Sequence, residues 1–523
     1  MSGKADNGAT SICVRDVPGN KTEPGTEEPS IEYSIFPERQ KIFFMMIATT
    51  VNFLAPTTAT IYYPALLPLS KDLDVPATSL NLSIVTYMIA EGVVPLLTGR
   101  VSDRQGRRPV LIVCLLLYLG ANVGLAVQGS FAALLALRCL QSFGTSGAAV
   151  VASAVTSDLI TRAERGKYIA YTSLGFTVGP ALGPILGGIL AQFLGWRSIF
   201  WFLVILTGVL LCLIILLLPE SSRSLVDNGS VPPQNWNRPL VDMVHSHASK
   251  GPSSSRSPSV AGLWLGILAT VKVVLDREPR LLIFSLTLFF CGCMAVLTTM
   301  PALLEETYSM NALQVGLCYI PYAVGGLASR WAFGALADWN FRRHAHKAGV
   351  EVQRNRQTAR QLRAIPMEKA RLEPIIPLVC CSCLCVLGYA WTMDYQTHLS
   401  GPLILLFLLG MSTAGVTNMT TALLLDVQGH QPGTAFAALF AFRFLVGAGV
   451  VAGSLPLAHR IGVGWMGTVV AGIWFLITPV LGMIYLYGHG WRTEVPLVLA
   501  GGSSVPQTTE NAPESLTGHK VEA

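Results

Sequence analysis

The sequence predicts an all-α membrane protein with twelve transmembrane helices in two pseudo-symmetric six-helix bundles. First, 51% of its 523 residues are hydrophobic and only 13% are charged, about half the charge of a typical soluble domain. Second, twelve apolar runs are each long enough to cross ~30 Å of hydrocarbon as a helix. Third, a charged motif recurs after the second and the eighth run. This composition excludes a disordered chain, a nucleic-acid-binding protein and an ordinary cytosolic enzyme, because lipid must cover much of the surface.

Each apolar run is predicted to be a helix, because in lipid the backbone must satisfy its own hydrogen bonds. In chain order, the predicted spans are 41–64, 79–99, 109–128, 131–156, 167–193, 197–218, 281–303, 312–336, 374–392, 401–425, 433–457 and 464–487.

Polar segments divide these helices into two domains. Residues 1–40 have no apolar core, which predicts a disordered cytoplasmic tail and no cleavable signal peptide. The Ser-, Pro- and Gly-rich segment 219–280 is a cytoplasmic linker between a bundle at 41–218 and a bundle at 281–487. Residues 488–523 form a second cytoplasmic tail.

The placement of charge predicts the orientation. Most of the 36 Lys and Arg fall in the tails and in the connections that follow even-numbered spans. By the positive-inside rule, both termini are cytoplasmic. The basic connection 337–373 is either a solvated cytoplasmic segment, which we favour, or a surface for anionic lipid heads.

A short motif repeats between the halves. Gly99-Arg-Val-Ser-Asp103-Arg-Gln-Gly-Arg107-Arg108 follows the second span, and Gly334-Ala-Leu-Ala-Asp338-Trp-Asn-Phe-Arg342-Arg343 follows the eighth. Gly, Asp and the two Arg keep their spacing. Duplicated halves around a central site are typical of an alternating-access transporter.

This motif resembles the signature between helices 2 and 3 of the major facilitator superfamily. The resemblance implies the superfamily fold and a charge cluster that latches one conformation. We expect Gly99 to allow two helices to approach closely, Asp103 to pair with Arg107, and the basic residues to face anionic lipid. The expected latch residues are Gly99, Asp103, Arg104, Arg107, Arg108, Asp338 and Arg342.

The fifth span carries glycines at four-residue spacing and two prolines. Such a stripe permits close backbone contact, and proline allows a bend. The full pattern, GxxxGPxxGPxxGG, resembles the antiporter motif of proton-coupled drug exporters in this superfamily, which favours export. Its residues are Gly175, Gly179, Pro180, Gly183, Gly187 and Gly188.

Three ionisable residues inside the spans are the main functional candidates, because an unpaired charge at mid-membrane costs ~2.5–3.5 kcal/mol or more. They are Glu91, Arg138 and Arg443. A carboxyl shielded from water is a natural proton carrier, so we assign proton coupling to Glu91 with Arg138. Alternatively, Arg138 is a structural counter-ion for Glu91. Asp158 and Asp426 are interpreted as interfacial charges at helix ends.

Arg138 with Gln141 resembles the RxxQ pattern of helix 4 in the drug:proton antiporters, although Ser142 stands where that family has Gly. Tyr62, Tyr87, Gln141 and Arg443 are the expected lining of the substrate cavity.

Further segments, including Ile61-Tyr-Tyr-Pro-Ala-Leu66 and Pro366-Met-Glu-Lys-Ala-Arg371, resemble the fungal quinidine-resistance-type branch of these antiporters, which includes organic-acid exporters. The sequence departs from that branch in having Thr60 for Asn, Glu91 for Gln, and Leu439-Phe440 for an Asn pair. These changes favour a substrate less polar, or more cationic, than citrate.

Together these features predict a secondary active transporter that exports a drug, toxin or secondary metabolite by proton antiport and alternating access. An organic-acid exporter, or less favoured a nutrient importer, is the alternative. We expect no enzymatic activity, cofactor, metal or nucleic-acid partner. The expected partners are a small-molecule substrate, protons and membrane lipid. The protein would be a multi-pass monomer of the plasma membrane, with the vacuolar membrane as the alternative.

Overall fold

The computed structural model describes residues 38–159, 165–226, 237, 272–347, 349, 366–428 and 432–494. Within these residues the regular elements are helices, without a strand. Nearly all of the predicted tails and most of the predicted linker lie outside the described residues.

The helices follow the predicted apolar runs. The first half contains α1 (Glu38–Thr60), the 3-10 turn η1 (Tyr63–Ala65), α2 (Leu66–Leu73), α3 (Ala77–Gln105), α4 (Arg107–Val127), α5 (Phe131–Leu159), α6 (Arg165–Leu194), α7 (Arg197–Leu217) and the short α8 (Arg223–Val226). The second half contains α11 (Arg277–Tyr308), α12 (Ala312–Cys318), α13 (Ile320–Lys347), α15 (Met367–Asp394), α16 (Ser400–Val427), α17 (Pro432–Ile461) and α18 (Val463–Glu494).

Eleven helical segments among the described residues are long and apolar enough to cross a membrane. They coincide with eleven of the twelve predicted spans. The remaining prediction, 167–193, corresponds to α6, whose described apolar stretch is the shorter Val178–Leu194.

Several helices extend beyond their predicted ends. The span predicted at 312–336 is interrupted at Tyr319 and then continues as α13 to Lys347, while α15 begins at Met367 and α18 ends at Glu494. The ends of the predicted 337–373 connection and the start of the 488–523 tail are therefore helical. Hydropathy locates the part of a helix that suits hydrocarbon, whereas the backbone hydrogen bonds of a helix continue into polar sequence.

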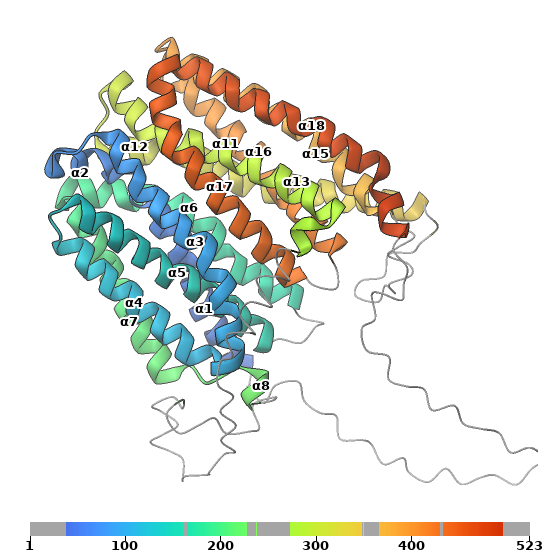
Figure 1. The fold of residues 1–523 in the computed structure, drawn as a ribbon, viewed down its shortest axis with the longest axis horizontal. Coiled ribbons are helices and arrows are strands. Elements are labelled where there is room, and N and C mark those ends of the chain that lie inside the picture. Colours follow the sequence, from blue (N-terminus) through green and yellow to red (C-terminus); the bar gives the residue numbers. More distant parts are fainter. Residues whose placement is uncertain are drawn as a thin grey trace, which may run out of the picture.

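The helices form two groups (Figure 1). In the first group, α1 packs against α5 and α6, and α4 packs against α5 and α7. In the second group, α15 packs against α16 and α18, and α13 packs against α16. The groups meet where α3 packs on α17 and where α6 packs on α12.

The glycine stripe of α6 explains the close contact between α6 and α1. A Cβ atom on Gly175 would lie 2.5 Å from the carbonyl oxygen of Thr49, and one on Gly179 would lie 2.7 Å from Pro56 Cγ. Cβ atoms on Gly183 and Gly187 would collide with Thr60 and with the carbonyl oxygen of Ile61. A larger residue at these positions would push the two backbones apart.

Gly188 faces the other group of helices. A Cβ there would lie 2.8 Å from the carbonyl oxygen of Ala312 in α12. At the same end of the molecule, Lys71 Nζ lies 3.1 Å from Glu305 Oε1, which joins α2 to α11. At the opposite end, the ribbons of α1 and α8 lie apart from those of α13 and α18 (Figure 1).

Candidate substrate and proton site

Arg138 lies inside the first group of helices and is 1% exposed. Its Nη1 donates to Gln141 Oε1 at 2.6 Å, one helical turn along α5. Gln141 Nε2 in turn donates to Asn122 Oδ1 in α4 at 2.7 Å. The amide of Gln141 therefore links the guanidinium of Arg138 to a neighbouring helix.

Two tyrosine rings contact the Arg138 guanidinium. Its Cζ lies 4.3 Å from the ring centroid of Tyr62 and 4.6 Å from that of Tyr87. Such cation–π contacts partly replace water around a buried cation. Ser83 Oγ donates to the Tyr62 hydroxyl at 2.9 Å, and the Tyr87 hydroxyl donates to the Ala55 carbonyl oxygen at 3.1 Å.

The structure thus gathers four predicted site residues into one buried network. Tyr62, Tyr87 and Gln141, which are predicted to line the substrate cavity, are each at most 1% exposed in this conformation. The side chains cover one another, so the network is closed to water in this conformation. Sequence spacing brings Arg138 and Gln141 together, but it does not show that the tyrosines cover the arginine.

Glu91 lies on α3, where this helix crosses α17, and is partly exposed. A Cβ on the neighbouring Gly92 would lie 3.2 Å from the carbonyl oxygen of Ala441 in α17. The carboxylate interacts electrostatically with Arg443 and, less strongly, with Arg138. Within the described part of the chain it forms no ion pair, so neither guanidinium neutralises it by direct contact.

Arg443 lies on α17, in the second group of helices, and is surrounded by phenylalanine rings. Its Cζ lies 4.4 Å from the ring centroid of Phe440, 4.5 Å from that of Phe290 and 5.0 Å from that of Phe444. Arg443 Nε is buried without a hydrogen-bond partner among the described residues. Leu439, the other member of the pair noted in the sequence, is buried.

The predicted pairing within the first latch motif is present. Arg107 forms ion pairs with Asp103, one turn before it, and with Asp158 at 2.9 Å. Asp158 lies one residue before the end of α5, in agreement with its interpretation as a helix-end charge, and the ion pair with Arg107 makes it part of this cluster. Because Asp158 ends α5 and Arg107 begins α4, only the packing of these helices reveals the pair.

The structure differs from two expectations for the same motif. A Cβ on Gly99 would make only an ordinary contact, 3.7 Å from Val150 Cγ1, so no close helix approach requires glycine there. Arg104 is exposed, but Arg108 is 5% exposed and its Nη2 donates to the Ile215 carbonyl oxygen at 2.8 Å. Arg108 therefore does not face lipid heads. The glycine that the backbone requires is Gly106, whose φ is 104°.

Glu220, which no sequence pattern singles out, caps the start of α4. Its carboxylate accepts from the backbone N–H of Arg107 at 2.8 Å and of Arg108 at 3.2 Å. Asn237 Nδ2 donates to the same carboxylate at 2.7 Å. A carboxylate at a helix N-terminus accepts hydrogen bonds from the N–H groups that have no partner within the helix, and its negative charge interacts favourably with the helix dipole.

In the second half, the corresponding ion pair involves other residues than predicted. Arg371, near the start of α15, lies 2.9 Å from Asp426 at the end of α16. Neither Asp338 nor Arg342 forms an ion pair within the described residues. The motif copies diverge because α13 continues past Arg342, whereas Arg107 begins a new helix.

The sequence model of the Major Facilitator Superfamily matches residues 48–452. The chain belongs to this superfamily. It is therefore an integral multi-pass membrane transporter, not an enzyme, and transporters of the superfamily carry small-molecule substrates.

Curated relatives of the chain are fungal transporters of the superfamily. MFS-type transporter R5 of Phoma sp. is 40% identical over 460 residues, covering 88% of this chain and 87% of its own. MFS-type transporter tstD of Talaromyces stipitatus is 37% identical over 481 residues, covering 90% and 86%. Citrate exporter 1 of Aspergillus niger is 28% identical over 498 residues, covering 92% and 94%.

A solved structure supports the same fold. The human organic anion transporter MFSD10 (TETRAN) matches 85% of this chain and 100% of its own with a TM-score of 0.55. The sequence identity is 19%, so this likeness concerns the fold alone.

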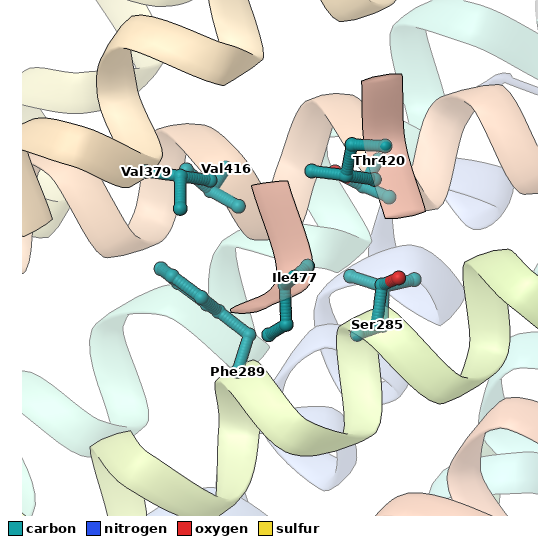
Figure 2. A pocket seen from close by; sticks show the side chains of 8 residues that line it. Ser285, Phe289, Val379, Val416, Thr420 and Ile477 are labelled. Atoms are coloured by element: carbon teal, nitrogen blue, oxygen red, sulfur yellow. The ribbon is translucent and has the colours of Figure 1, made fainter. Parts of the chain in front are cut away.

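A pocket in this superfamily member lies within the second group of helices, away from the residues described above. Ser285 and Phe289 of α11 face Val379 of α15, Val416 of α16 and Ile477 of α18 (Figure 2). Its lining is almost entirely apolar and contains none of the predicted site residues. We interpret it as a packing gap between four helices.

Proposed function

We propose that this transporter is a proton antiporter of the drug:proton antiporter family, in its quinidine-resistance-like branch, and that it exports a small organic molecule by alternating access. The cargo would be a drug, toxin or secondary metabolite. The antiporter-like stripe of α6 supports export, as does the relative named as a citrate exporter. The protein would act as a monomer with two six-helix bundles, in the plasma membrane or the vacuolar membrane.

The position of Glu91 carries this proposal. It lies where the two groups of helices cross, and it interacts with one arginine from each group. A carboxylate at such a crossing changes its interaction with both groups when it gains a proton. Protonation would remove its attraction to Arg443, while Arg138 would keep its tyrosine and glutamine partners.

The contacts between the groups support an alternating cycle. We assign the α2 and α12 end to the outer face, where Gly188 and the Lys71–Glu305 pair would close the path. The latch ion pairs Arg107–Asp158 and Arg371–Asp426 would then lie on the cytoplasmic face. In the described conformation α6 and α12 are in contact, so the path would be closed at the outer face.

The substitution Glu91→Gln tests the proton role. Proteoliposomes with an acidic lumen would be offered rhodamine 6G and 2-(hydroxymethyl)anthraquinone. We expect wild type to accumulate at least one probe, and Glu91→Gln to lose gradient-driven accumulation, because glutamine cannot carry a proton at this position. Wild-type and variant unfolding temperatures should agree.

The control is Glu306→Gln, which removes an exposed carboxylate at the end of α11. It should accumulate the probes like wild type. Accumulation by Glu91→Gln at the wild-type rate at every pH would rule out proton coupling through Glu91.

The name of the Aspergillus niger relative supports an organic-acid exporter as the second candidate. The partly exposed Arg443 would suit a carboxylate cargo. The same vesicles loaded with citrate distinguish the candidates, because transport of citrate without transport of either probe would favour the organic-acid exporter. Proton-independent uptake of a sugar would instead favour an importer.

A further inference from the structure

A row of aromatic side chains leads along α17 to Arg443. Phe436, Phe440 and Phe444 follow one another at four-residue spacing, with ring centroids 4.5 Å and 5.6 Å apart. Phe436 is 41% exposed, whereas Phe444 is 8% exposed and contacts Phe290 of α11. The row therefore runs from an exposed ring to the partly buried and buried rings that surround the Arg443 guanidinium.

Arg443 and Glu91 present opposite hydrogen-bonding groups beside these rings. The terminal nitrogens of Arg443 are not among its buried atoms and donate to no group in the described part of the chain. Glu91 is partly exposed and offers only acceptors when ionised. Each charge compensates the other electrostatically without direct contact.

We propose that Arg443, Glu91 and the Phe436–Phe440–Phe444 row form the site for a neutral, planar aromatic molecule that carries a carbonyl acceptor and a hydroxyl donor. The rings would stack on the aromatic system of the ligand, Arg443 would donate to its carbonyl oxygen, and Glu91 would accept from its hydroxyl. This proposal specifies the ligand class of the proposed exporter, and it rests on the proposed function for the direction of transport.

The charges of the two polar residues favour a neutral ligand. Glu91 and Arg443 together carry no net charge when both are ionised, so a charged ligand would be attracted by one of them and repelled by the other, whereas a neutral ligand can hydrogen-bond to both. The third charge, on Arg138, is covered by Tyr62 and Tyr87 and is closed to a ligand.

This arrangement also explains exchange of ligand for protons. A hydrogen bond to an ionised carboxylate is about twice as strong as one between neutral groups. A proton on Glu91 therefore weakens ligand binding, and a bound hydroxyl opposes protonation. Ligand and proton would therefore bind in competition, which is one way to couple them in antiport.

Three matched probes test the ligand class on the full chain in lipid nanodiscs, by calorimetric titration without a proton gradient. They are 2-(hydroxymethyl)anthraquinone, 2-methylanthraquinone, which lacks the donor, and anthraquinone-2-carboxylate, which is anionic. At pH 8 we expect the hydroxymethyl compound to bind about ten- to 150-fold more tightly than either of the others, the value of one hydrogen bond to a charged group. This preference should shrink as the pH falls to 5.5, and in Glu91→Gln it should be smaller and independent of pH, because the amide oxygen still accepts a hydrogen bond but carries no charge.

The aromatic row is tested with Phe440→Leu, which keeps an apolar side chain but loses the ring. It should weaken binding of the hydroxymethyl and methyl compounds equally, by about three- to tenfold, because stacking does not need the hydroxyl. The matched control is Phe442→Leu on the same helix, at 41% exposure, which makes none of the ring contacts described above. It should bind both compounds like wild type.

Equal affinity of wild type for the hydroxymethyl and methyl compounds, or tightest binding of the carboxylate, would overturn the proposed ligand class. An equal effect of Phe440→Leu and Phe442→Leu would overturn the role of the row. These outcomes are separate from the proton role: binding needs no gradient, so a failed preference leaves gradient-driven transport untouched. Conversely, a clear preference without gradient-driven transport would refute antiport alone.

Discussion

Arg138 shows how a single charge can be held inside apolar helices. Only Nη1 has a hydrogen-bond acceptor, while Nε and Nη2 are buried without one among the described residues. The rings of Tyr62 and Tyr87 compensate part of this deficit through cation–π contact. Gln141 is therefore the residue that satisfies the other buried polar groups here, since it accepts a hydrogen bond from Arg138 and donates one to Asn122.

Replacing Gln141 by Ala should destabilise the protein more than an ordinary buried substitution on α5. The guanidinium of Arg138 would lose its acceptor and Asn122 Oδ1 its donor, at about 1–3 kcal/mol for each unsatisfied buried group. Thermal unfolding of the purified protein in detergent measures this loss as a lower Tm. The control is Thr156→Val, because Thr156 Oγ1 bonds only within its own helix, to the Ala152 carbonyl oxygen. Equal Tm values for Gln141→Ala and Thr156→Val would contradict this role.

Residue patterns predicted part of this site. The i, i+3 spacing places Gln141 beside Arg138, and scarcity of charge in the spans singles out Glu91 and Arg443. The aromatic partners could not be predicted with the same certainty, because Tyr62, Tyr87 and Phe290 come from other helices and reach the arginines only through packing. Phe440 and Phe444 do share a helix with Arg443, and their spacing was an available signal.

At the scale of the helix, the packing of α6 depends on glycines, which have no Cβ atom. Gly175, Gly179, Gly183 and Gly187 face α1, whereas Gly188 faces α12. One helix therefore packs tightly within its own group and also forms a contact between the groups. The sequence predicts this stripe, but it does not show that the last two glycines face different partners.

Gly187→Ala should destabilise the contact between α6 and α1, because the new Cβ would collide with the carbonyl oxygen of Ile61. Overpacking of this kind costs about 1–3 kcal/mol. Gly208→Ala is the matched control on α7, where a Cβ would meet nothing within 4 Å. There alanine should stabilise the helix by about 0.5–1 kcal/mol. The two variants should shift Tm in opposite directions. A Tm for Gly187→Ala at or above that of wild type would show that α1 can move away from α6 without loss of stability, and would contradict the prediction.

The position at which each helix ends also determines whether the two copies of the repeated motif form the same ion pairs. The sequence repeat pairs Asp103 with Asp338 and Arg107 with Arg342, but the ion pairs at the ends of α4 and α15 involve Arg107 with Asp158 and Arg371 with Asp426. A repeat in sequence predicts related helices. The partner of each charge depends on where the helices end, which hydropathy locates only approximately.

For the whole molecule, the question is what keeps the two groups of helices together at the α2 and α12 end. The Lys71–Glu305 pair is exposed, with side chains 75% and 29% accessible. Such pairs contribute about 0–1 kcal/mol. The contact of Gly188 with Ala312 is instead a backbone contact without room for a side chain. Close packing should therefore hold this end more firmly than charge.

This difference predicts an order of effects. Gly188→Ala should shift the population of the closed end by about five- to 150-fold, the range given by an overpacking cost of ~1–3 kcal/mol. Lys71→Gln should shift it by at most about fivefold, because an exposed pair is worth ~1 kcal/mol or less, and the charge-swapped Lys71→Glu with Glu305→Lys should resemble wild type. Spin labels at positions 74 and 310 report the distance across this end, and Gly472→Ala on α18, where a Cβ meets nothing within 4 Å, is the control. A larger shift for Lys71→Gln than for Gly188→Ala would show that the ion pair, and not the glycine contact, closes the molecule.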